Sequence, residues 1–98
     1  MHRHGRVTAS IENSKEYLIL LVHRLMKMYI ETGASGIEVE SGYRDTLETN
    51  LFAVTSNAIQ KAFCKLQNLL LKEYQVVLKA VRHSRRLYLT IEQENPAL

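Results

Sequence analysis

The residues best suited to chemistry in this 98-residue chain lie between Asn57 and Arg86. Plotted at 100° per residue, they recur at steps of three or four and share one helical face. This basic strip carries cationic and amide side chains and no acid: Asn57, Lys61, Lys65, Asn68, Lys72, Gln75, Lys79, Arg82 and Arg86. On a helix, the distance from Lys61 to Arg86 would be about 37 Å. Such a length predicts a polyanion as the partner rather than a small molecule.

A solvated helix face is the alternative interpretation, because lysine and arginine often cover surface helices. Binding is favoured because acids are absent from the strip and because its amides can hydrogen-bond sugar hydroxyls. A membrane surface is a competing polyanion. However, helices that lie on a membrane surface place Trp or Phe beside their basic residues. Here the large apolar groups are on the opposite, packing face.

The chain has no motif for catalysis or for holding a metal. It lacks a paired-carboxylate signal, a Cys/His cluster at metal spacing, a dinucleotide-type glycine turn and a Gly-x-Ser-x-Gly elbow. Cys64 shares the chain with His23 and His83, but nothing in the spacing positions a base beside it. His2 and His4 supply too few ligands for a metal. The sequence therefore predicts a binding protein that is not an enzyme and uses no cofactor or metal.

Length, composition and charge predict what kind of domain carries the basic strip. A chain of 98 residues with 46% hydrophobic and 23% charged residues predicts one domain with a modest core, residues 1–98. The formal net charge is +3. The lone Cys64 cannot form an internal disulfide, and Leu18 to Val22 is too short a run for a signal peptide. We expect a soluble cytoplasmic protein, in the host-cell cytoplasm if it is viral.

The first helix should begin at a cap formed by Ser10 or Ser14 and end near Thr32, where Gly33 permits a left-handed turn. Residues 1–9 are expected to be a mobile basic arm. The apolar stripe of this helix is wider than one neighbouring helix would cover. This width predicts a homodimer, in which a partner copy covers part of the stripe. The alternative is that the second long helix of the same chain folds back and covers the whole stripe. The expected dimer interface comprises Leu18, Leu21, Val22, Leu25, Phe63, Leu66 and Leu70.

The rest of the chain is expected to be a connector followed by one long basic helix. Gly33 to Gly42 reads as the connector, with a short extended segment at residues 37–39. Ser41 can cap a helix continuing to Arg86, with a bend or break near residues 55–57, or another near residues 73–75. Residues 87–91 alternate weakly, and 92–98 are expected to be a frayed tail. The predicted fold class is all-α, a helix-loop-helix pairing into an antiparallel dimeric four-helix bundle.

Part of the second helix resembles the RNA-silencing suppressors of insect nodaviruses. The similarity lies in Gln60–Phe63, Asn68–Lys72, Val76–Val77 and Arg44–Asp45. It implies a four-helix dimer that binds double-stranded RNA without sequence preference and shields it from Dicer and from small-RNA loading. A Dicer-type host protein is a further implied partner, and no small-molecule substrate is implied. Lys72 falls on an RNA-contacting position, whereas Cys64 falls where the family has a contacting arginine.

A second resemblance points to another class of protein. The following residues are similar to the second half of a regulator of G-protein signalling domain: Ile37, Val39, Glu40, Ser41, Arg44, Asp45, Leu47, Tyr74, Leu78 and Lys79. That helical module would bind a G-protein α subunit and ignore RNA. An RNA-binding protein should instead bind a generic duplex with a steep salt dependence.

Overall fold

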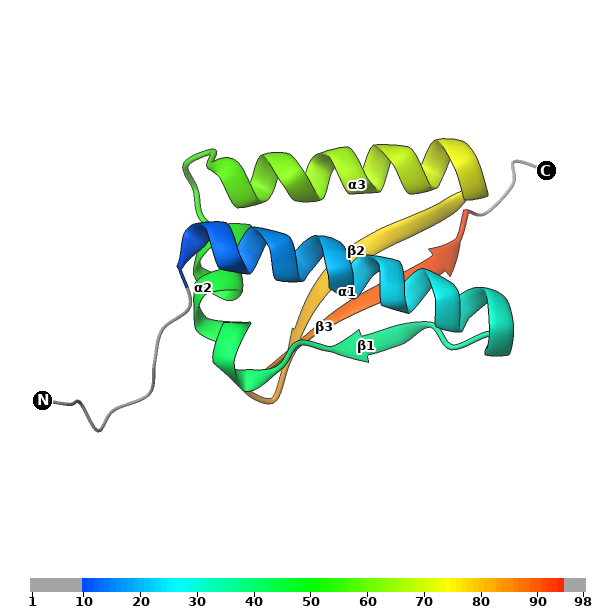
Figure 1. The fold of residues 1–98 in the computed structure, drawn as a ribbon, viewed down its shortest axis with the longest axis horizontal. Helices are drawn as coiled ribbons and strands as arrows, with labels where there is room; N and C mark the ends of the chain where they lie inside the picture. The colour runs from blue at the N-terminus through cyan, green and yellow to red at the C-terminus, as the bar shows by residue number, and fades with distance from the viewer. Residues whose placement is uncertain (1–9, 95–98) are drawn as a thin grey trace, which may run out of the picture.

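Three helices and a three-stranded antiparallel sheet make up residues 10–94, the part of the chain that this computed structural model describes. The bounds are Ile11–Thr32 for α1, Gly36–Glu38 for β1, Ser41–Leu51 for α2, Ala58–Tyr74 for α3, Val76–His83 for β2 and Arg86–Gln93 for β3. In Figure 1, α3 forms the upper edge, α1 crosses in front of the sheet, and α2 lies at one end. The prediction of an all-α four-helix bundle is therefore wrong.

The first helix begins and ends where the sequence predicted. Ser10 is its N-cap and accepts a hydrogen bond from the Asn13 N–H at 3.0 Å, which satisfies one of the free amides of the first turn. At the other end, Gly33 takes a φ of 78° and donates its N–H to the Tyr29 carbonyl. That left-handed conformation favours glycine.

The start of α2 is held by a side chain from α1 rather than by its own cap. Ser41, the expected cap, is the first residue of the helix, and its N-cap, Glu40, makes no side-chain capping bond. The Glu40 N–H instead donates to the Tyr17 hydroxyl at 2.9 Å. The Tyr17 ring stacks on Tyr43 with centroids 3.9 Å apart, and burial raises the pKa of Tyr17.

The long helix predicted from Ser41 to Arg86 is broken twice. The first break, residues 52–57, falls where a bend was expected, and Asn57 restarts the helix by accepting a hydrogen bond from the Gln60 N–H. The second break is at Gln75, which adopts a left-handed φ of 57°. The chain beyond Gln75 continues as a strand and not as a bent helix.

The two long strands form a hairpin, and β1 completes the sheet in the order β1-β3-β2. Their apolar side chains alternate, so Val76 and Leu78 of β2 are buried with Leu87, Leu89 and Ile91 of β3. That period of two is the mark of a strand with one covered face. Glu92 and Gln93, expected to lie in a frayed tail, belong to β3. The expected arm, 1–9, and the last residues, 95–98, lie outside the described residues.

The core lies between α1 and the inner face of the sheet. It takes up most of the side chains expected at a dimer interface: Leu18, Leu21, Val22 and Leu25 are between 0% and 2% exposed, and Leu70 is 4% exposed. Phe63 and Leu66 are half-buried against the same core. The centre of the α1 stripe is thus covered within the single chain by the sheet and the other helices, whereas Ile19, Leu20 and Ile30 at its borders remain 45% to 64% exposed. The homodimer stays a prediction, but most of the side chains named for its interface are buried in the core of one chain.

Candidate nucleic-acid interface

Only the part of the predicted basic strip that lies on α3 forms a continuous surface in the structure. Lys61, Lys65, Asn68 and Lys72 are all exposed and recur at steps of four, three and four along a regular helix. The buried and half-buried residues Ile59, Phe63, Leu66 and Leu70 lie on the other side of that helix. At 100° per residue the two sets are centred about 160° apart. The lysines therefore lie on the side of α3 that faces away from the core. We call Lys61, Lys65, Asn68 and Lys72 the outer face of α3.

The lysines of this outer face have no acidic partner. Within residues 10–94, every ion pair involves other cations. The only acid on α3 is Glu73, at its last turn. Three ammonium groups are thus held on one side of a helix, and no carboxylate in the described part of the chain pairs with them. Along the axis they extend from Lys61 to Lys72, about 17 Å at the helical rise.

The two amides at the ends of α3 have structural roles. Asn57 is the N-cap, and its Nδ2 donates to the Asn50 carbonyl at 3.0 Å. Gln75 is the C-cap, and its Nε2 donates to the Lys72 carbonyl at 3.1 Å. Both were predicted to contact RNA. In the structure their side-chain donors or acceptors are engaged with the backbone, so neither extends the outer face.

The remaining cations of the predicted strip lie on the hairpin and are paired. Lys79 lies 3.2 Å from Glu92, and Arg86 lies 3.5 Å from Glu38 of β1. Lys79 and Arg86 belong to the sheet surface that the helices leave open, because their strand neighbours Leu78 and Leu87 point into the core. They do not continue the line of the α3 lysines.

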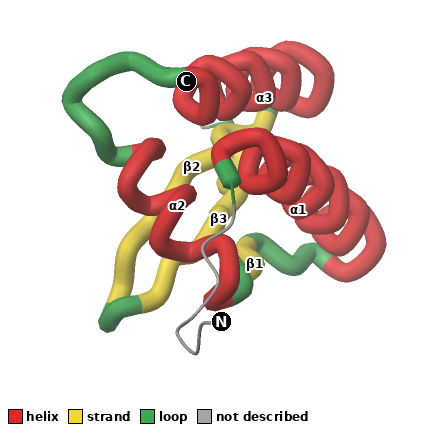
Figure 2. Tube along the Cα trace, turned by 60° about the vertical axis from the view of Figure 1, so that its left-hand side comes forward, coloured by secondary structure: helices red, strands yellow, loops and turns green. Residues whose placement is uncertain are grey.

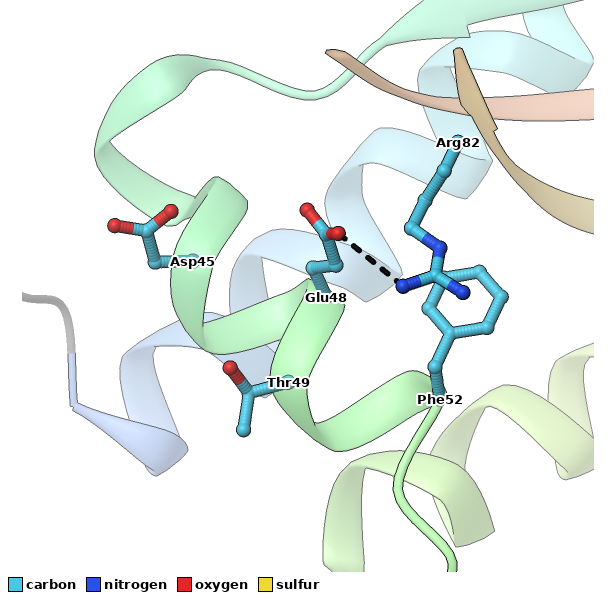
Figure 3. Close-up of a pocket in the computed structure, with 5 residues that line it drawn as sticks. All are labelled: Asp45, Glu48, Thr49, Phe52 and Arg82. Atoms are coloured by element: carbon cyan, nitrogen blue, oxygen red, sulfur yellow. Dashed lines mark hydrogen bonds and ion pairs between the residues drawn. The ribbon is translucent and has the colours of Figure 1, made fainter. Parts of the chain in front are cut away.

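Arg82 is the third residue of the predicted strip that lies on the hairpin. Its side chain contacts α2 and the residue that follows it. Its guanidinium carbon lies 4.2 Å from the centre of the Phe52 ring, and its Nη1 lies 3.5 Å from the Glu48 carboxylate. Figure 3 shows the guanidinium beside both side chains, with Asp45 and Thr49 on the same helix. Nothing in the sequence pattern predicted this contact, because Glu48 and Arg82 are separated by the end of α2, the loop, α3 and most of β2. Arg82 therefore has a structural role.

The tip of the hairpin is basic but lies far from α3. Ser84 and Arg85 form the turn, both with positive φ values of 49° and 68°, which is the backbone of a type I′ turn. Figures 1 and 2 both place this turn at the opposite end of the molecule from α3. One flat surface cannot contact the tip and the outer face of α3 together. The candidate site is therefore α3 alone.

No protein-family model, curated protein or solved structure matched this chain when it was compared with all three. Among the described residues, no group of three or more His, Cys, Asp or Glu could hold a metal ion. No helix in the same part of the chain is long and apolar enough to cross a membrane. The function must therefore be argued from the geometry of α3.

Proposed function

We propose that this protein binds double-stranded DNA by placing the outer face of α3 in the major groove. The observation that carries the proposal is the line of Lys61, Lys65 and Lys72, which faces away from the core and has no acidic partner among residues 10–94. Phosphate binding needs such free cations, because each neutralised phosphate releases condensed counterions. Asn68, at the middle of the line, is of the residue type that pairs with adenine through two hydrogen bonds.

The length of the basic line favours DNA over RNA. The expectation of RNA rested on one long basic helix reaching Arg86 and on the resemblance to the nodavirus suppressors, whereas α3 ends at Tyr74. A line of about 17 Å suits one helix entering the major groove of B-DNA, which is about 12 Å wide and admits a helix. The major groove of an RNA duplex is too narrow for side chains to read. Duplex RNA would need a longer surface across its minor groove.

The order of elements agrees with this use of α3. The chain runs α1-β1-α2-α3-β2-β3 with the strands ordered β1-β3-β2, which is also the order of elements in winged helix-turn-helix domains. In a helix-turn-helix, the second helix of the pair lies in the major groove. In this chain, α3 is the second helix of the pair α2-α3. The connection 52–57 is longer than the usual turn of about three to four residues. The chain therefore matches winged helix-turn-helix domains in the order of its elements but not in the length of this turn.

The test is a fluorescence-anisotropy titration of a short random-sequence DNA duplex, with the RNA duplex of the same sequence as comparison. We expect binding to DNA that is tighter than to RNA and that weakens steeply with salt. The variant Lys65→Ala/Lys72→Ala should weaken DNA binding at least about tenfold and lower the slope of log K against log salt by about 0.9 for each lost phosphate contact.

The matched control removes two other cations from the same chain. Lys79→Ala/Arg86→Ala changes the net charge equally but acts on the ion-paired sheet surface. Its DNA affinity should stay within a few-fold of the original protein. Equal losses in the two variants would show that only total charge matters, and would refute a site on α3. Tighter binding to the RNA duplex would refute the choice of DNA.

A further inference from the structure

A groove between α1 and α3 combines an apolar floor with a basic rim. Its volume is about 450 Å³, and it is lined by Lys15 and Ile19 of α1 and by Ala58, Lys61, Ala62, Lys65 and Leu66 of α3. The two helices run in the same direction and lie closest at their N-terminal ends (Figures 1 and 2). The groove lies in this narrow part, where small alanines on α3 leave space beside Ile19.

The apolar floor of the groove is accessible to solvent beside fully buried residues of the same helices. Ile19 is 45% exposed, whereas Leu18 and Val22, which flank it on the same helix, are 0% and 2% exposed. Leu69, one turn beyond Leu66 on the same side of α3, is 52% exposed. An exposed apolar strip with polar borders is the type of surface that binds another protein.

The charges on the rim define which partner fits. Lys15 borders the groove on α1, and Lys61 and Lys65 border it on α3. Lys61 and Lys65 have no acidic partner among residues 10–94, and Lys15 has only Glu12, at 3.7 Å and largely exposed. An occupant therefore needs apolar side chains on one face and carboxylates on both flanks of that face.

We propose that this groove binds an amphipathic helix of a partner protein whose apolar stripe is flanked by Asp and Glu. A groove between two neighbouring helices accepts a third helix through anchors at i, i+3, i+4 and i+7. Its lining residues recur at steps of four on each helix, Lys15 and Ile19 on α1 and Ala58, Ala62 and Leu66 on α3, so a third helix lying along them would keep its polar side in solvent. The proposal stands apart from DNA binding, although the helix would cover Lys61 and Lys65 and so would compete with DNA.

The probe is a synthetic helical peptide with leucines at those spacings and glutamates on both flanks of the leucine stripe. We would measure its affinity by anisotropy and map its site from amide shifts in ¹⁵N-labelled full-length protein. The shifts should centre on Ile19, Ala62 and Leu66. A peptide with glutamine in place of each glutamate should bind at least about fivefold more weakly, because it lacks the charge complementarity.

Two variants separate this proposal from the proposed function. Ile19→Lys removes the apolar anchor and adds positive charge at an exposed position, so the peptide should bind at least about tenfold more weakly while DNA binds as well as before. Lys72→Glu lies outside the groove, so it should weaken DNA binding and leave peptide binding unchanged. Equal affinity for the glutamate and glutamine peptides, or shifts centred away from the groove, would overturn the inference.

Discussion

The outer face of α3 and the two strands of the β2-β3 hairpin each hold three Lys or Arg side chains, and of these only the three on α3 have no acidic partner among residues 10–94. On α3, Lys61, Lys65 and Lys72 face solvent with no acid in reach among the described residues. On the hairpin, Lys79, Arg82 and Arg86 each lie within 3.5 Å of a carboxylate. Charge along a sequence therefore says little until the neighbours of each group are known.

The difference follows from the kind of element that carries each set. A helix that packs on one side can present a whole face free of cross-chain neighbours. A side chain in a sheet always has neighbours on adjacent strands, directly opposite and diagonally. Glu92 of β3 and Glu38 of β1 occupy such neighbouring positions. The hairpin cations serve the fold, whereas the α3 cations remain available to a ligand.

Charge reversal gives the largest expected effect and the strictest test of this contrast. Lys65→Glu/Lys72→Glu should lower DNA affinity by about a hundredfold or more at low salt, because each change removes a phosphate contact and adds repulsion. The same reversal at Lys79 and Arg86 alters the net charge equally and should cost only a few-fold. The contrast fails if the two titration curves coincide.

Loss of Arg82 should affect stability and not binding. Arg82→Ala removes the stacking on Phe52 and the ion pair with Glu48, and we expect the free energy of unfolding to fall by about 1 kcal/mol. Urea denaturation followed by circular dichroism measures it, with Arg85→Ala in the turn as the matched loss of charge. An Arg82 variant as stable as wild type would mean that the cluster does not hold the hairpin to α2.

The hairpin turn offers a smaller gain in the opposite direction. Ser84 and Arg85 both adopt left-handed backbone conformations, which Asn-Gly occupies with less strain in a type I′ turn. Ser84→Asn/Arg85→Gly should raise the thermal midpoint, corresponding to about 0.5 to 1 kcal/mol. DNA affinity should be nearly unchanged despite the lost arginine. A marked fall in affinity would place the hairpin tip in the DNA site.

The smallest effect is expected for the pair of Lys79 and Glu92. Both side chains are more than half exposed, at 52% and 62%, so water screens their attraction. A double-mutant cycle with Lys79→Met and Glu92→Gln should give a coupling energy below about 0.5 kcal/mol. A coupling well above that value would mean that the hairpin ion pairs contribute materially to stability.

The helical half of the fold could be predicted because its ends carry specific chemistry. Ser10 and Gly33 bound α1, and Asn57 lies at the break before α3, as capping and left-handed turns require. The short extended segment predicted at residues 37–39 corresponds to β1, whereas β2 and β3 were missed for a physical reason. The turns that separate them use Gln75, Ser84 and Arg85 in left-handed conformations, so no Gly or Pro marks them in the sequence.

The unmarked turns also explain which part of the candidate site the sequence predicted correctly. Lys61, Lys65, Asn68 and Lys72 could be placed together because helical periodicity is a local property. Lys79, Arg82 and Arg86 happen to continue that spacing across two unmarked turns. Their acidic partners come from α2, β1 and β3, and nothing in one sequence shows which distant carboxylate a cation will meet.

The sheet is assembled from one local and one distant pairing. β2 and β3 meet across the turn at Ser84 and Arg85, whereas Gly36 of β1 pairs with Thr90. Closing the long loop between β1 and β3 carries an entropic cost that the hairpin does not incur. During folding, the hairpin can thus form beside α3 before the first half of the chain joins it. We therefore expect addition of β1, together with docking of α1, to be slower than hairpin formation.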